Sequence, residues 1–215
     1  MASILIKILP LDLAATLSPG ILALAIILLG SKNQPKAKAL ILLLGTLLVA
    51  IAITVFGFIL GNNVTPGVEP TLTSAIIDAI FGLFFLFYGF KIILGPERMI
   101  KPREEKVRFW RLFILGFLVS ATNFDALFLS FAAAKEVGDA AVHFGAKSIL
   151  LAVNIFFFTL PIMLPLIIYL LFPEFAGRVL ANINRIVLKY SRYILFAMFM
   201  IFGIYFLSKS LGFFI

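Results

Sequence analysis

The chain has no cysteine and only one histidine among its 215 residues. Without cysteine, the protein has no disulfide, no thiolate metal site and no thiol redox chemistry. His143 has no carboxylate at a metal-ligand spacing, and the sequence contains no HExxH, GxSxG or phosphate-loop motif. We therefore expect neither an enzyme nor a bound cofactor or metal.

Charge is also scarce. Only 13% of the residues are charged and 63% are apolar, whereas soluble domains are about a quarter charged. The mean hydropathy is +1.16. A soluble fold of this composition would lack polar side chains to cover its surface, so the sequence predicts an integral membrane protein in a lipid bilayer. The net charge of +8 fits basic cytoplasmic loops, and no soluble basic domain is present to bind nucleic acid.

Long apolar runs indicate the fold class. A membrane-spanning helix needs roughly 20 apolar residues, and the runs that qualify are 4–29, 40–60, 72–94, 112–134, 148–172 and 193–214. The first run carries Asp12 and Pro19 and lacks a small-residue cleavage site, so we interpret it as a retained helix and not a signal peptide. We predict an all-α integral membrane protein with six transmembrane helices.

The basic residues predict the orientation. Fourteen of the eighteen Lys and Arg residues lie in segments 31–38, 91–111 and 178–192, which are on the same side of six successive spans. Because cytoplasmic loops are enriched in Lys and Arg, we predict a multi-pass cell-membrane protein with both termini extracytoplasmic.

Two connections have patterns of their own. Segment 62–71 (NNVTPGVEPT) is rich in turn-forming residues, and its Asn63-Val64-Thr65 is a glycosylation sequon of a kind that also arises by chance. In segment 174–192 the apolar and basic residues fall on different helical faces. This pattern predicts a helix in the cytoplasmic interface, with a basic extension of the sixth helix as the alternative.

The two halves resemble each other weakly. Residues 15–23 (ATLSPGILA) align with 120–128 (SATNFDALF). Each half would contain three helices, and an odd number makes the second half enter the membrane upside down. We predict one membrane domain built from repeat 1–95, a basic loop 96–111 and repeat 112–215. Inverted repeats of this kind are common in secondary transporters, whose sites lie where the repeats meet.

Helix breakers and polar residues inside the apolar runs are the candidate site. Pro19 and Gly20 should kink or unwind the first helix, although a plain proline kink is the alternative. Thr122, Asn123 and Asp125 form the densest polar group within any run. A charge near the bilayer centre costs at least ~2.5–3.5 kcal/mol, so we expect Asp125 to face a cavity or a polar partner. A purely structural hydrogen bond is the alternative.

Three further polar residues are weighed in the same way. Asp12 is placed at about the same distance from the outer end of its helix as Asp125, so the two carboxylates could share a proton or a cation. Solvation of Asp12 from outside is the alternative. Asn154 is a further candidate, on a helix that Pro161 and Pro165 are expected to break. Asp78 is expected to be wetted near an outer helix end.

These residues resemble the LysE superfamily of six-helix exporters, which includes amino-acid exporters, cation-efflux proteins and GAP-type proteins linked to glycolipid export. One similar segment is LSPGILALAIILLGSKNQPKAKALILLLGTLLVAI (17–51). The other is LGFLVSATNFDALFLSFAAA (115–134), where the amino-acid exporters carry Asn-Pro-Lys-Ala. Asn123 and Ala126 match that signature, but Phe124 and Asp125 do not. The chain is thus more similar to the GAP-type and cation-efflux branches, and most similar to the GAP-type branch.

The sequence and the resemblance together predict a secondary exporter of a small or amphiphilic solute. Asp125 would carry a proton or cation, and Asn123 and Ser18 would be polar ligands. The break at Pro19 and Gly20 would leave backbone groups without hydrogen-bond partners in the helix. An ion gradient would supply the energy, because no nucleotide-binding motif is present. The alternative is a non-transporting scaffold for a lipid or envelope complex, and a homodimer is a further expectation for either.

Overall fold

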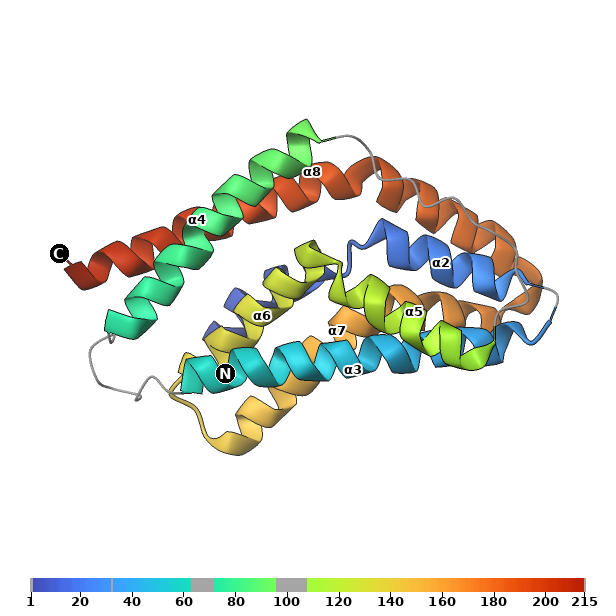
Figure 1. The fold of residues 1–215 in the computed structure, drawn as a ribbon, viewed down its shortest axis with the longest axis horizontal. Coiled ribbons are helices and arrows are strands. Elements are labelled where there is room, and N and C mark those ends of the chain that lie inside the picture. The colour runs from blue at the N-terminus through green and yellow to red at the C-terminus, as the bar shows by residue number, and fades with distance from the viewer. Residues whose placement is uncertain (1, 32, 63–71, 96–107, 215) are drawn as a thin grey trace.

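The computed structural model describes residues 2–31, 33–62, 72–95 and 108–214, and these form eight helices with no strand among them (Figure 1). Most of the predicted basic loop and the Asn63 sequon lie outside the described residues. The helices are α1 (Ala2–Ala15), α2 (Pro19–Leu29), α3 (Pro35–Asn62), α4 (Leu72–Leu94), α5 (Phe109–Ala121), α6 (Phe124–Asp139), α7 (Phe144–Leu171) and α8 (Pro173–Phe214).

Two of the predicted spans are broken helices. The axes of α1 and α2 differ by 57°, and those of α5 and α6 by 71°. Within the described residues, four single helices are long and apolar enough to cross a membrane, and the total is six if each bent pair is one span. Both halves contain a bent pair followed by two long helices. The inverted relation of the halves and the division into two repeats stay predictions.

Glycines let α3 pack closely along the second bent pair. A methyl group on Gly45 would overlap the backbone of Phe113, and one on Gly116 would overlap the backbone of Leu42. Further along α3, Gly57 and Gly61 lie against the backbone of α6. Small residues at such crossings are typical of helix packing in membranes. The close approach also brings Ser120 Oγ within 2.8 Å of Thr46 Oγ1, to which it donates a hydrogen bond.

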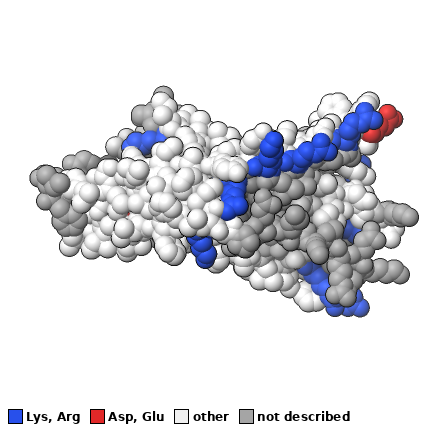
Figure 2. All heavy atoms as spheres, turned by 90° about the horizontal axis from the view of Figure 1, so that it is seen from above, with Lys and Arg blue, Asp and Glu red and all other residues white. Residues whose placement is uncertain are grey.

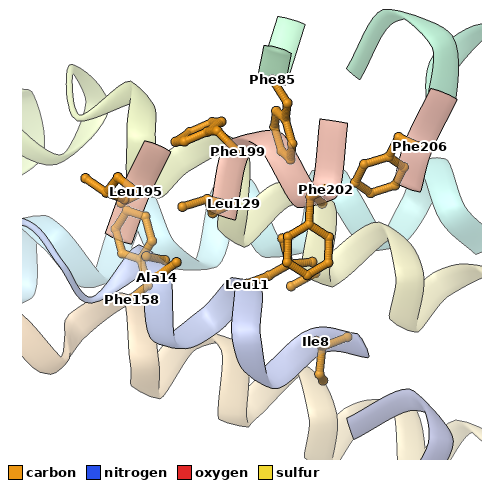
Figure 3. Close-up of a cluster of buried hydrophobic side chains, with 14 of the residues drawn as sticks. Ile8, Leu11, Ala14, Phe85, Leu129, Phe158, Leu195, Phe199, Phe202 and Phe206 are labelled. Carbon is orange, nitrogen blue, oxygen red and sulfur yellow. The ribbon is translucent and has the colours of Figure 1, made fainter. Parts of the chain in front are cut away.

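Helix α4 packs chiefly against α8, and the pair forms a layer on one side of the molecule (Figure 1). Aromatic side chains pack α4 against α8 within this layer. In Figure 3, Phe85 of α4 points toward Phe199 of α8, and their ring centroids are 5.0 Å apart. Arg192 of α8 donates hydrogen bonds to the carbonyl oxygens of Ile92, Ile93 and Gly95 at the end of α4. These bonds satisfy carbonyl groups that have no partner within α4 itself.

The structure differs from the sequence predictions in two long helices. Helix α7 continues through Pro161 and Pro165, which we expected to break it. Both prolines are buried, so packing holds the helix together where backbone hydrogen bonds are lost. The predicted interfacial helix is the first part of the continuous helix α8, as in the alternative interpretation. Its Ala176, Leu180 and Ile183 pack against α2, α3 and α7, and its position relative to the membrane surface stays a prediction.

Candidate functional site

The starts of two helices meet at the breaks in the bent pairs. Ser18 is the residue before α2, and Asn123 is the residue before α6. Asn123 Nδ2 donates a hydrogen bond to Ser18 Oγ at 2.8 Å. The first amides of a helix have no partner within it and carry a partial positive charge. The expectation that Pro19 and Gly20 interrupt the first helix is therefore confirmed, because α2 begins at Pro19.

A buried polar network lies beside these breaks and is centred on Asn154 of α7. Its Nδ2 donates hydrogen bonds to Asp12 Oδ1 at 2.6 Å and to the Ser130 carbonyl oxygen at 3.1 Å. Its Oδ1 accepts hydrogen bonds from Thr54 Oγ1 at 2.6 Å and from Ser130 Oγ at 3.0 Å. Four helices, α1, α3, α6 and α7, thus contribute to one network.

Asp12 is the acidic member of this network. It is 0% exposed, so the alternative of solvation from outside is wrong. Among the described residues its Oδ2 has no hydrogen-bond partner, and none of the ion pairs involves it. A buried carboxylate oxygen with a free position is suited to hold a proton or to contact a small cation.

The other predicted residues lie around the breaks. Asp125 is half-buried in the first turn of α6, where the positive end of the helix favours a negative charge. Thr122 directly follows α5, and its exposed hydroxyl donates a hydrogen bond to the Leu118 carbonyl oxygen at 2.8 Å. Gly20 follows Pro19 in the first turn of α2. The structure therefore groups the predicted residues near the two breaks.

A second group of ionisable residues, which the sequence did not predict as a site, lies at the end of the molecule where α6 ends. Lys135 Nζ is 2.8 Å from Asp78 Oδ1 and 2.9 Å from Asp139 Oδ2. The side chains of Lys135 and Asp78 are 1% and 2% exposed. The expectation that water surrounds Asp78 is wrong, because the ammonium group of Lys135 takes the place of that water.

Other charges extend this group to four helices, α1, α4, α6 and α8. Lys209 Nζ is 2.8 Å from Glu136 Oε1 and 3.2 Å from Asp139 Oδ2, and Lys7 Nζ is 3.7 Å from Glu136 Oε2. We call Lys7, Asp78, Lys135, Glu136, Asp139 and Lys209 the charged cluster. It joins the α4–α8 layer to α1 and α6, and its three cations balance its three carboxylates.

One sequence signal pointed to the charged cluster. Lys135 and Asp139 are four residues apart, a spacing that places them on the same helical face. The fourth apolar run ends at residue 134, but α6 continues to Asp139. The helix continues because its charges find partners inside the protein.

An apolar groove lies between α3, α4 and α6. Its volume is about 370 Å³, and only Ile, Leu and Phe side chains line it. Phe124, at the start of α6, lines one part, and Leu60, near the end of α3, and Ile77, near the start of α4, line another. The groove therefore extends from the break toward the charged cluster.

The comparisons with known proteins give one match. The family model described as "Sap, sulfolipid-1-addressing protein" matches residues 8–212. No curated protein matches the chain, and no solved structure does. The match supports the predicted relation to lipids in a membrane, whereas membership of the LysE superfamily stays a prediction. Because the model covers nearly the whole sequence, this chain belongs to the family of the sulfolipid-1-addressing protein Sap.

Proposed function

We propose that this chain is a secondary transporter of a lipid-linked or other amphiphilic solute, driven by a proton or cation gradient. The observation that carries the proposal is the hydrogen bond from Asn123 to Ser18, which joins the starts of α2 and α6 at the two breaks. Transporters commonly build substrate and ion sites from half-helices that begin within the membrane. The family description supports a solute related to sulfolipid.

Two carboxylates would carry the coupling ion. Asp12 has a free oxygen in a buried network, and Asp125 lies in the first turn of α6 beside the break. Asn154 would pass a change at Asp12 to α3 and α6, because Thr54 and Ser130 bind its amide oxygen. The polar ligands of the solute would be Ser18, Thr122 and Asn123, together with the backbone groups freed at Pro19 and Gly20.

Lipid movement between the two leaflets tests this proposal. The purified protein is placed in phosphatidylcholine liposomes that contain a sulfated glycolipid with an NBD fluorophore, and a pH gradient is imposed. Dithionite quenches only the outer leaflet, so the protected fraction reports translocation. We expect the wild type to translocate the lipid faster with the gradient than without it, and Asp12→Asn and Asp125→Asn to lose this acceleration.

Glu174→Gln is the matched control. Glu174 is an exposed carboxylate at the start of α8, far along the chain from both breaks. It should retain gradient-driven translocation. Undiminished acceleration in both aspartate variants would remove these carboxylates from the mechanism, and no translocation by the wild type would contradict the transporter proposal itself.

The second candidate is an accessory protein that helps a lipid-handling complex. The observation that favours it is a row of basic side chains on the α8 face of the molecule (Figure 2). Arg178, Arg185 and Lys189 are exposed in the first half of α8 and would suit an acidic partner or an anionic membrane surface. Co-purification with a partner complex, without lipid translocation by the isolated protein, would favour this function.

A further inference from the structure

We propose that the groove between α3, α4 and α6 binds one acyl chain of a lipid, a site that rests on the proposed handling of an amphiphilic solute. The first reason is its chemistry. Every lining side chain is Ile, Leu or Phe, and the volume of about 370 Å³ falls within the ~300–1,000 Å³ range of ligand sites. In a bilayer, hydrocarbon chains are the apolar molecules that can enter such a groove.

The second reason is the way α4 is attached. Its backbone packs chiefly against α8 and not against α3 or α6. Large aromatic rings bridge the distance to α6, as where Phe81 stacks on Phe131 with ring centroids 4.8 Å apart. Between α3 and α4, Phe56 and Ile80 line the groove and are more than half exposed. The groove is therefore open along its side, where a lipid chain can enter from the bilayer.

The third reason is that polar groups flank the groove. Phe124 lies between Asn123 and Asp125 at the break, and Ile77 precedes Asp78 of the charged cluster. On α6, the lining residues Phe124 and Phe131 are seven residues apart, or roughly 10 Å along the helix. An apolar path of this length with polar residues at its ends suits an amphiphile better than a pure hydrocarbon.

Photolabelling tests the groove directly. The purified full-length protein is placed in phosphatidylcholine liposomes with increasing fractions of a phosphatidylglycerol that carries a diazirine in its acyl chain, and labelled peptides are mapped after illumination. We expect labelling of the groove segments of α3, α4 and α6 to saturate, and excess unlabelled phosphatidylglycerol to compete with it.

A matched pair of variants distinguishes the groove from ordinary lipid contact. Ile80 lines the groove and is 61% exposed, whereas Leu83 on the same helix is 62% exposed and does not line it. Ile80→Trp should fill the groove and lower the saturable labelling about tenfold, equivalent to ~1.4 kcal/mol. Leu83→Trp should leave it unchanged, and both variants should fold because both side chains are exposed.

Two results would overturn the inference. One is labelling that rises in proportion to the probe and spreads over all lipid-facing helices. The other is an equal loss in Ile80→Trp and Leu83→Trp. The outcome is separate from that of the transport assay: saturable groove labelling without translocation supports the groove and contradicts the transporter proposal. Gradient-driven translocation with unsaturable labelling supports the transporter proposal and contradicts the acyl-chain site in the groove.

Discussion

At the scale of single residues, the buried polar network around Asn154 satisfies the hydrogen-bonding groups of that residue and leaves one oxygen of Asp12 without a partner among the described residues. An asparagine side chain has two donor and two acceptor positions, and Asn154 uses all four. Asp12 and Asn154 were recognisable in the sequence as polar residues in apolar runs. Their pairing was not, because they are 142 residues apart and only the fold brings them together.

The ion pair between Lys135 and Asp78 gives a prediction at this scale. Removal of one member of a buried pair leaves an uncompensated charge, which costs ~3–5 kcal/mol, whereas replacement of both by apolar residues is often neutral. Lys135→Met should therefore lower the free energy of unfolding by about that amount, and Lys135→Met combined with Asp78→Leu should lower it less. Denaturant unfolding in detergent micelles measures both.

The control for this prediction is Lys36→Met, at an exposed position in the first turn of α3, which should change stability little. Equal losses in the single and double variants would show that the pair does not act as a unit. Asp78 also has Lys209 at 3.5 Å, so the single variant is expected near the lower end of the range.

At the scale of helices, the sequence predicted the breaks unequally. Pro19 has no backbone N–H and begins α2, so the first break had a local chemical cause. The second break, at Thr122 and Asn123, contains neither Pro nor Gly and could be expected only from the alignment of the two halves. Conversely, Pro161 and Pro165 do not break α7, because their helix is held by its neighbours.

The crossing of α3 and α5 gives a prediction at this scale. A methyl group at Gly116 would overlap the backbone of Leu42, which cannot move aside as a side chain can. Gly116→Ala should therefore destabilise the protein by ~1–3 kcal/mol. At Gly212 of α8 no atom lies within 4 Å of an added methyl group, so Gly212→Ala should be neutral or stabilise by up to ~1 kcal/mol. Thermal unfolding in detergent compares the two, and equal stabilities would contradict the close packing.

At the scale of the whole molecule, the basic residues are mostly paired at one end and mostly exposed at the other. Both termini lie at one end, together with the turn between α6 and α7, whereas the turn between α2 and α3 lies at the other (Figure 1). At the first end, Lys7, Lys135 and Lys209 pair with carboxylates. Lys147 there donates hydrogen bonds to Asn62 Oδ1 and the Gly138 carbonyl oxygen.

The opposite end carries the exposed basic residues of α3, α5 and α8. They include Lys36, Arg111, Arg178, Arg185 and Lys189. The number of basic residues at each end can be counted from the sequence. The ion pairs at the first end could not be predicted from it, because the paired carboxylates lie on helices that are distant in the sequence. Unpaired positive charge is thus distributed more unevenly between the two ends than the number of basic residues, whereas the predicted orientation rests on that number alone.

The predicted topology can be tested by cysteine labelling. Because the wild type contains no cysteine, it does not react with a maleimide and serves as the background. His143 lies in the turn between α6 and α7, Asn33 lies between α2 and α3, and both are exposed. A membrane-impermeant maleimide should label His143→Cys in intact cells, but Asn33→Cys only after permeabilisation, because basic connections remain in the cytoplasm. The opposite pattern would invert the orientation. Labelling of both positions from one side would mean that α3, α4 and the bent pair of α5 and α6, which lie between them, do not cross the membrane as we expect.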